Sequence, residues 1–170
     1  MAASEVIDAA TVARAYFEAV GRRDLDAMTG FYEPGGSGEI HGLIELVVPD
    51  SYRAWFANLF QAFPDFQFEV LDLMSNDEKA AVRWRARGHF TGRVRFEGMI
   101  ANGAAVDVQG CDVLWIRNGR IRRNDAYMNG AEMARQLGAL PPQGSIGERA
   151  ATGAINLKTR LRAWIDSRRG

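Results

Sequence analysis

The sequence predicts a single α+β domain, because amphipathic helical segments precede a series of alternating strand segments. Before Pro64 the apolar residues recur at helical spacing, and after it they alternate with polar residues. The dipeptide Asn118-Gly119 between two alternating segments is typical of a β-hairpin. This order favours an antiparallel or mixed sheet over a parallel sheet of βαβ units.

Three helices are expected before the strands. Residues 11–20 carry one apolar stripe, and Asp24 is placed to cap a short second helix. A third helix begins near Asp50 and presents a broad aromatic face that includes Trp55 and Phe56. The stretch 33–38, which is rich in Gly and Pro, is suited to turns and does not continue the second helix.

Four strands and a short helix are expected after Pro64. The segments are 66–70, 81–87, 105–116 and 120–128 for the strands and 131–137 for the helix. In the second strand the arginines at 83, 85 and 87 share one face. Such a row can bind an acidic substrate, face solvent or pair across a subunit interface, and the sequence leaves these alternatives open.

Composition limits the classes of protein that fit. The 170 residues suit one domain with a tail, so we expect a domain over 1–142 and an extension over 143–170. Lys and Arg balance Asp and Glu at 21 each, which supplies no broad attraction to nucleic acid or to anionic membranes. Cys111 is the only cysteine, no apolar stretch is long enough to span a bilayer, and the first residues lack a signal-peptide pattern. We therefore expect a cytoplasmic protein without nucleic-acid or membrane partners.

The extension is predicted to be a basic helix with one narrow apolar flank. The residues of this flank are Ile155, Leu157, Leu161, Trp164 and Ile165. It can pack on its own domain, cover a neighbouring subunit or lie on a membrane surface. Because Gly153 interrupts a stripe that is already narrow, packing against protein is favoured.

Three stretches of the sequence, taken in order, resemble a known family. They read AYFEAVGRRDLDA (15–27), FPDF (63–66) with AVRWRARG (81–88), and GCDVLWI (110–116) with NGRI (118–121) and ARQLG (134–138). Over about residues 12–145 the chain is similar to the SnoaL-like, polyketide cyclase-like branch of the nuclear transport factor 2-like superfamily. The resemblance implies a cystatin-like α+β cone, in which a curved sheet wraps around helices and leaves a pocket open at one end. It also implies a homodimer that packs the outer faces of the sheets together.

Fold alone does not name the reaction, because relatives with this fold catalyse isomerisation, cyclisation, epoxide hydrolysis or dehydration, and others only bind. The resemblance implies a cofactor-independent isomerase, cyclase or hydrolase that acts on a small apolar carbonyl or epoxide compound. The alternative is a non-catalytic module of the same fold that binds a ligand or dimerises.

Asp112 and Tyr16 are the first candidates for catalysis. Asp112 lies in an apolar strand, on the face opposite Cys111, and an unpaired carboxylate there is costly without a purpose. The resemblance matches Asp112 to the protonated aspartate of ketosteroid isomerase-like relatives and Tyr16 to their oxyanion-binding tyrosine. A neutral Asp112 would donate a hydrogen bond to an enolate, whereas an ionised one would act as a base. The alternatives are a carboxylate bonded to a neighbouring strand and a tyrosine that completes the core.

The general base of the relatives has no direct counterpart here. The position that matches the aspartate base of the isomerases falls near Ile40, where the neighbours Glu39 and His41 are the candidate substitutes. The position that matches the acid/base aspartate of the cyclases is Ala126. By alternation Asp125 faces outward, as an interface or surface carboxylate, while the residues on either side of it in the strand face the pocket. A slip or bulge of one residue would reverse this facing and make Asp125 the cyclase-like acid, so both alternatives stay open. The residues expected to bind substrate are Asn124, Met128, Trp55, Phe56 and Leu114.

No motif in the sequence suggests a cofactor or a metal. The two histidines, His41 and His89, belong to no spaced cluster of metal ligands, and we expect no metal site. The sequence contains no phosphate-binding loop and no nucleophile elbow, so we expect no cofactor.

Overall fold

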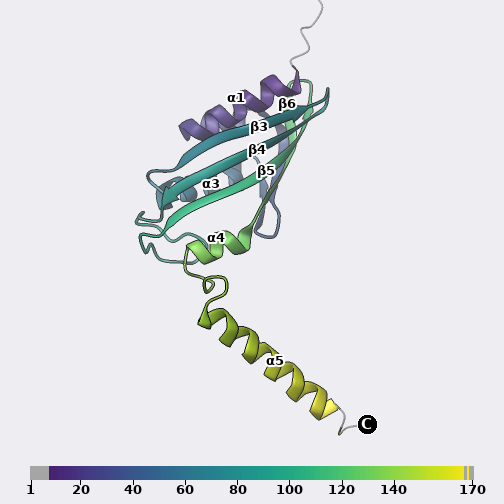
Figure 1. Ribbon diagram of the computed structural model, residues 1–170. Coiled ribbons are helices and arrows are strands. Elements are labelled where there is room, and N and C mark those ends of the chain that lie inside the picture. Colours follow the sequence, from purple (N-terminus) through teal and green to yellow (C-terminus); the bar gives the residue numbers. More distant parts are fainter. Residues whose placement is uncertain (1–7, 167, 169–170) are drawn as a thin grey trace, which may run out of the picture.

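The computed structural model describes residues 8–166 and residue 168. Helices and strands follow one another along the chain as expected for an α+β protein (Figure 1). The elements are α1 (Ala9–Arg22), α2 (Leu25–Gly30), β1 (Tyr32–Ile40), β2 (Ile44–Val47), α3 (Asp50–Ala62), β3 (Gln67–Ser75), β4 (Lys79–His89), β5 (Ala105–Arg117), β6 (Arg120–Met128), α4 (Gly130–Gln136) and α5 (Ile146–Asp166).

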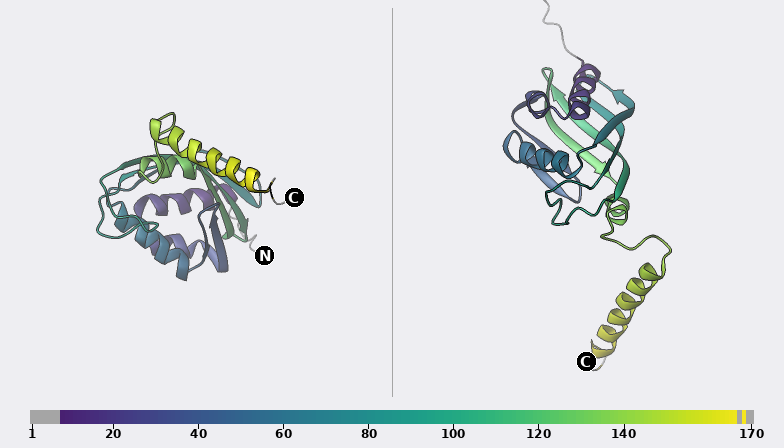
Figure 2. Two further views of the ribbon diagram at one scale, coloured as in Figure 1. Left: turned by 90° about the horizontal axis from the view of Figure 1, so that it is seen from below. Right: turned by 90° about the vertical axis from the view of Figure 1, so that its left-hand side faces the viewer.

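The six strands form one curved sheet in the order β2-β1-β6-β5-β4-β3. Neighbouring strands are antiparallel except for β1 and β6, which run parallel, so the sheet is mixed. Its concave face wraps around α1 and α3 (Figure 2, left). The predicted fold class, a curved sheet around helices with an additional C-terminal helix, is confirmed.

The Gly-rich stretch 33–38 is part of strand β1 rather than a turn between helices. The physical reason is that the backbone of β1 packs very closely against neighbouring atoms at Gly36. A Cβ atom on Gly36 would lie 3.0 Å from the ring of Tyr32 and 3.2 Å from the carbonyl oxygen of Ile121. Glycine therefore serves close strand packing at this position, and its usual association with turns misled the prediction.

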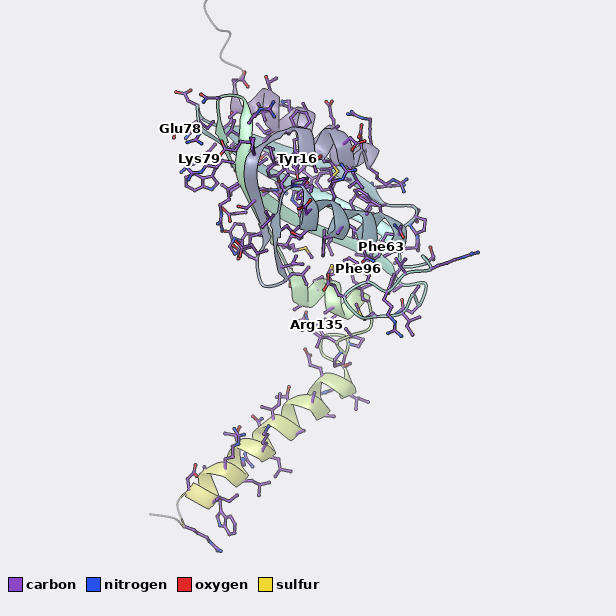
Figure 3. All side chains as sticks on the ribbon, turned by 180° about the vertical axis from the view of Figure 1, so that it is seen from behind. Tyr16, Phe63, Glu78, Lys79, Phe96 and Arg135 are labelled. Atoms are coloured by element: carbon purple, nitrogen blue, oxygen red, sulfur yellow. The ribbon has the colours of Figure 1, made fainter. Side chains whose placement is uncertain are left out.

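The core lies between α1 and the concave face of the sheet, and Figure 3 labels Tyr16, one of its residues. The apolar stripe of α1 buries Val12, Tyr16 and Phe17, and the ring of Phe17 stacks on that of Phe68 with 5.4 Å between centroids. In β4 the alternation places Val82 and the other even-numbered residues inside, while the arginines at 83, 85 and 87 face outward. Two of the arginines form ion pairs on that outer face, Arg85 with Asp107 and Arg87 with Glu69.

Helix α5 stands apart from the cone (Figure 1; Figure 2, right). Its first turn is held by Arg135 of α4, whose Nη2 atom lies 3.4 Å from Glu148 Oε1, whereas residues 149–166 are exposed. In the single chain the extension does not pack on its own domain within the described residues, and packing on a partner subunit stays a prediction. No helix in the described part of the chain is both long and apolar enough to cross a membrane.

Candidate functional site

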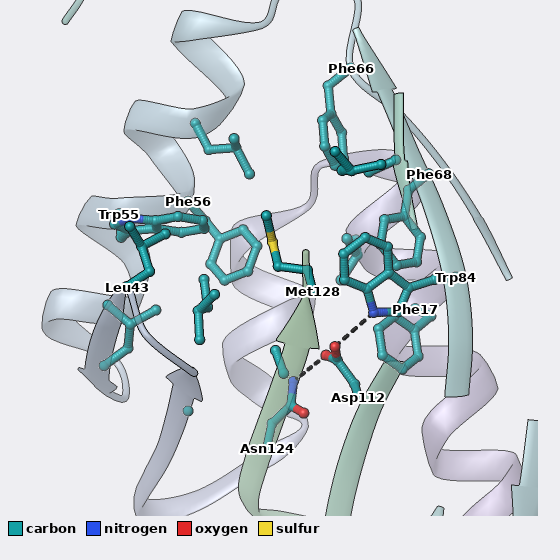
Figure 4. Close-up of a pocket in the computed structure, with 18 of the residues that line it drawn as sticks. Phe17, Leu43, Trp55, Phe56, Phe66, Phe68, Trp84, Asp112, Asn124 and Met128 are labelled. Atoms are coloured by element: carbon teal, nitrogen blue, oxygen red, sulfur yellow. Dashed lines mark hydrogen bonds between the residues drawn. The ribbon is translucent and has the colours of Figure 1, made fainter. Parts of the chain in front are cut away.

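A cavity of about 120 Å³ lies between the helices and the concave face of the sheet. Aromatic side chains are prominent in its wall (Figure 4). They are Tyr16, Phe17, Tyr32, Tyr52, Trp55, Phe56, Phe63, Phe66, Phe68, Trp84 and Phe96. Asp112 and Asn124 add polar atoms to the same wall. The space is therefore apolar, with a few hydrogen-bonding groups at defined points, which is the usual character of a small-molecule site.

Asp112 accepts two hydrogen bonds from neutral donors. Trp84 Nε1 donates to Oδ1 at 2.7 Å, and Asn124 Nδ2 donates to Oδ2 at 2.7 Å (Figure 4). The residue is only 6% exposed. Burial raises the pKa of Asp112 to about 6, although the hydrogen bonds from Asn124 and Trp84 act in the opposite direction. At neutral pH the carboxyl group is therefore mainly ionised, and it can accept a proton.

Trp84 reaches Asp112 because residue 110 has no side chain. A Cβ atom built on Gly110 would lie 2.3 Å from Cζ2 of the Trp84 indole. Trp84 of β4 is paired with Gly110 of β5, and both Trp84 and Asp112 face the cavity. Gly110 thus leaves the space in which the indole lies flat and points its N–H group at the carboxylate.

Three buried tyrosines meet beside this carboxyl group. The hydroxyl oxygens of Tyr16 and Tyr52 are 2.6 Å apart, and the Tyr32 hydroxyl lies 3.4 Å from that of Tyr16. Burial raises the pKa of each of the three well above the ordinary value, so all stay protonated. Two hydroxyl–hydroxyl contacts use two of the three protons, which leaves one proton available to a ligand.

Asn124 contributes a second unused polar atom. Its amide nitrogen bonds to Asp112, but its Oδ1 atom is buried and has no hydrogen-bond partner among the described residues. Such an orphaned acceptor costs free energy unless a ligand donor satisfies it. Asn124 is thus able to orient a bound compound.

His41 and Glu39 are directed to a different site on the outer face of the sheet. His41 Nδ1 lies 3.1 Å from Glu39 Oε1, its Nε2 lies 3.2 Å from Asp125 Oδ1, and its ring stacks on that of Tyr127. Glu39 borders the cavity, but its carboxylate binds His41 and Arg123. The polar atoms of His41 and Glu39 thus bond to each other, to Asp125 and to Arg123, and a role for either as the base of this pocket stays a prediction.

The same outer cluster groups three possible metal ligands that are not recognisable from their spacing in the sequence. One atom each from Glu39, His41 and Asp125 lie within 4.8 Å of one another, a grouping able to hold a metal ion. Arg123 already neutralises both carboxylates, with Nη2 at 2.8 Å from Glu39 and 2.7 Å from Asp125. Its hydrogen bond is the main reason why the pKa of Asp125 is lowered. Arginine thus occupies the place that a cation would take.

The other predicted residues divide between the pocket and the core. Trp55, Phe56, Met128 and Ala126 line the cavity. Leu114 faces inward and is fully buried in the core, and its predicted contact with substrate stays a prediction. His89 pairs with Asp65 at an exposed strand end, at 2.6 Å.

Sequence reasoning missed Tyr32, Tyr52 and Trp84 as parts of the site. Tyr32 lies at the start of strand β1, which the sequence did not predict, and Tyr52 lies in the third helix, where its spacing is also that of a core residue. For Trp84 a signal was present, since it alternates inward in β4 at the same time as Asp112 does in β5. A buried donor next to a buried carboxylate could have been inferred from that shared face.

The curved sheet wrapped around α1 and α3 is the nuclear transport factor 2-like α+β fold. Solved structures support this assignment of the fold. AclR, a proposed hydroxylase from Streptomyces galilaeus, is 22% identical, with a TM-score of 0.68 over 89% of this chain and 95% of that one. A proposed SnoaL-like polyketide cyclase from Jannaschia sp. CCS1 is 22% identical, with a TM-score of 0.69 over 84% and 99% of the two chains.

A third solved structure is a protein with a ketosteroid isomerase-like fold from Catenulispora acidiphila, 14% identical, with a TM-score of 0.63 over 75% and 92% of the chains. At these identities the likeness establishes the fold alone. The sequence profile of the SnoaL-like polyketide cyclases matches residues 10–137. The chain therefore belongs to the SnoaL-like polyketide cyclase family. No curated protein matches it.

Proposed function

We propose that the protein catalyses proton transfer at a carbon atom next to a carbonyl group of a small apolar compound. The observation that carries this proposal is the position of Asp112. It is a buried carboxyl group with a pKa of about 6, held by two neutral N–H donors, in an apolar cavity that also contains a tyrosine hydroxyl cluster. A base whose pKa lies near the working pH is the most efficient one.

In the proposed reaction the Asp112 carboxylate removes the proton, the C–H bond breaks, and its electron pair moves to the carbonyl oxygen. The resulting enolate accepts a hydrogen bond from the available proton of the Tyr16 and Tyr52 pair. Return of the proton from Asp112 to a different carbon gives an isomer. Attack of the enolate carbon on a second carbonyl of the same molecule instead forms a C–C bond and closes a ring by an aldol reaction, and the resulting alkoxide oxygen takes the proton from Asp112.

The volume of the cavity limits the size of the substrate. A space of about 120 Å³ is close to the volume, about 150 Å³, of an engineered protein cavity that binds benzene. We therefore infer a compound of one or two rings. A four-ring compound would require the aromatic wall to move, and Trp84 in that wall is fixed by its bond to Asp112.

The proposal can be tested without the natural substrate. Cyclohex-2-enone and 1-indanone are incubated with the protein in deuterated buffer, and exchange of the α-proton is followed by NMR. We expect exchange above the buffer rate, a loss of about 10²–10⁴-fold in Asp112→Asn, and a smaller loss in Tyr16→Phe. His41→Ala, on the outer face, is the matched control and should keep the full rate. Equal rates in the wild type and in Asp112→Asn would refute the proposal.

The second candidate is a protein of the same fold that binds a ligand and does not transform it. It is favoured by one observation, since the second carboxylate near the cavity, Glu39, is turned away toward Arg123 and His41. Under this alternative the ring compounds bind, as seen by a change in tryptophan fluorescence, but no α-proton exchanges. In either case the resemblance to the family leads us to propose a homodimer through the outer faces of the sheets.

A further inference from the structure

We propose that α5 is an arm that lies on the surface of a membrane containing anionic lipids. This inference is independent of the proposed function, and it begins with the way the helix is attached. Arg135 of α4 contacts Glu148 at the root of α5, and the same glutamate accepts a bond from the backbone N–H of Gly144. Ser145 Oγ accepts from the backbone N–H of Glu148 at 3.1 Å, as an N-cap does. From this root the helix projects away from its own cone (Figure 1; Figure 2, right).

The projecting part of the helix carries an apolar flank that the single chain leaves exposed. Leu157, Leu161 and Ile165 recur along one side and are 59%, 51% and 42% exposed. Trp164 lies on the same side and is 52% exposed, whereas Ile155 lies on the other side. A helix of 21 residues, about 31 Å long, thus presents one apolar side to its surroundings.

The charged residues of α5 are sorted around this flank. At about 3.6 residues per turn, Lys158 and Arg162 follow one border of the flank, and Arg149 and Arg160 follow the other. The two acidic residues of the helix lie on the opposite, polar side: Glu148 and Asp166. In this arrangement the long basic side chains reach the lipid headgroups while the apolar side enters the bilayer.

The arm is also strongly basic as a whole. Residues 143–170 contain six Lys or Arg and two Asp or Glu, so this segment carries a charge of +4. Since the whole chain is neutral, residues 1–142 carry −4. The neutral total, which predicts no general attraction to anionic membranes, therefore combines an acidic domain with a basic arm. Anionic lipids attract such a segment when it lies close to their headgroups.

The sheets of this protein do not match the arm. Its own cone leaves residues 149–166 exposed. The outer face of the sheet is the surface proposed for the homodimer. The basic side chains on that face, next to its apolar residues, are Lys79, Arg83 and Arg123. A helix with a charge of +4 is repelled by these cations, so the outer face of a second copy is disfavoured as the partner of α5.

Pairing of two α5 helices is opposed by charge as well. Lys158 and Arg160 border the flank on its two sides, so a parallel or an antiparallel pair would place like charges against each other. The expectation of a protein contact rested on Gly153, but the helix continues through that residue without interruption. An anionic bilayer matches α5 in both respects, because its headgroups attract the basic borders and its interior accepts the apolar side.

Vesicle binding tests the proposal on the full chain. The protein is mixed with phosphatidylcholine vesicles that contain either about 30% phosphatidylserine or none, and the bound fraction is measured by flotation. We expect binding to the anionic vesicles to be at least about tenfold tighter, and to weaken in about 0.5 M NaCl. No binding to the anionic vesicles, or equal binding to both kinds, would overturn the proposal.

Substitutions in the flank test whether α5 makes the contact. Leu157→Asn combined with Leu161→Asn should weaken binding to the anionic vesicles at least about tenfold, because both leucines enter the bilayer. Thr152→Asn combined with Thr159→Asn introduces the same residue on the polar side and is the matched control, which should bind as the wild type does. Equal binding by the two double variants would contradict the proposal.

Substitutions of the basic residues supply an independent test. Lys158→Gln combined with Arg162→Gln should weaken binding to the anionic vesicles at least about tenfold at low salt. Arg93→Gln combined with Arg122→Gln removes the same charge from exposed positions of the cone and should have little effect. An equal loss in both variants would mean that the arm is not the membrane-binding element.

Sedimentation without lipid distinguishes a membrane from a second copy as the partner of the flank. The wild type and the Leu157→Asn, Leu161→Asn variant should have the same oligomeric state, since the flank takes no part in self-association. A wild-type dimer that becomes a monomer in the leucine variant would assign the flank to a second copy and refute the membrane assignment.

Discussion

The Trp84 indole N–H group donates to Asp112 Oδ1 at 2.7 Å, inside a cavity lined by aromatic and aliphatic side chains. The second carboxylate oxygen accepts from Asn124, and none of the hydrogen bonds or ion pairs described for Asp112 comes from a cationic side chain. The carboxyl group is therefore stabilised as an anion only by neutral donors. The pKa of Asp112 is thus raised by burial and lowered by its two N–H donors.

The rate of α-proton exchange should depend on pH through Asp112. The ionised form is the base, so the rate should rise as pH increases through about 6 and become constant above it. The measurement is the NMR exchange rate between pH 4.5 and 8. A rate that falls as pH rises through this range would mean that the protonated acid is the active form.

The stability of the folded protein should also depend on the ionisation of Asp112. It should fall as pH rises, whereas the exchange rate should increase. The folded pKa of Asp112, about 6, is raised above the ordinary 3.8, so the folded protein binds the proton more tightly than the unfolded chain does. This contribution is fully present below pH 3.8 and is lost as pH rises to about 6, at a cost of about 3 kcal/mol.

Urea unfolding of the wild type and of Asp112→Asn at several pH values measures this effect. The difference in unfolding free energy between the two proteins should change across the interval from pH 3.8 to about 6 and be constant outside it. A constant difference throughout would show that Asp112 titrates normally.

Trp84→Phe should raise the pKa of Asp112 further. Phenylalanine keeps much of the apolar wall but removes the N–H donor, and a hydrogen bond to a charged group contributes about 1.5–3 kcal/mol. The pH profile of exchange should therefore move up by about one pH unit or more. Trp115→Phe, in which the substituted indole bonds to Asp125 on the outer face, is the control and should leave the profile in place.

Gly110→Ala should destabilise the protein by about 1–3 kcal/mol, because the new methyl group overlaps the indole of Trp84. The shift of the indole should also lower the exchange rate. Gly30→Ala is the comparison, since a Cβ atom there meets nothing within 4 Å. Thermal or urea unfolding of both variants gives the answer, and equal stabilities would show that the indole moves aside without cost.

The α+β class and the position of most helices and strands could be predicted from the sequence. The two-residue period of a strand predicts that Asn124 and Ala126 lie on one face of β6 and Asp125 on the other, but a slip of one residue would have reversed which face is inside. The expected register held because the bulge between β5 and β6 lies at Trp115 and Ile116, beyond these residues.

Which polar groups meet depends on how elements distant in the sequence pack together. Tyr16 and Tyr52 are 36 residues apart, and Trp84 and Asp112 are 28 apart, so no local pattern specifies their contacts. The parallel pairing of β1 with β6 brings His41 to Asp125 on the outer face rather than to the cavity. Local periodicity fixes the side of an element on which a residue lies, but its neighbour depends on how distant elements pack, and that packing assembled the site.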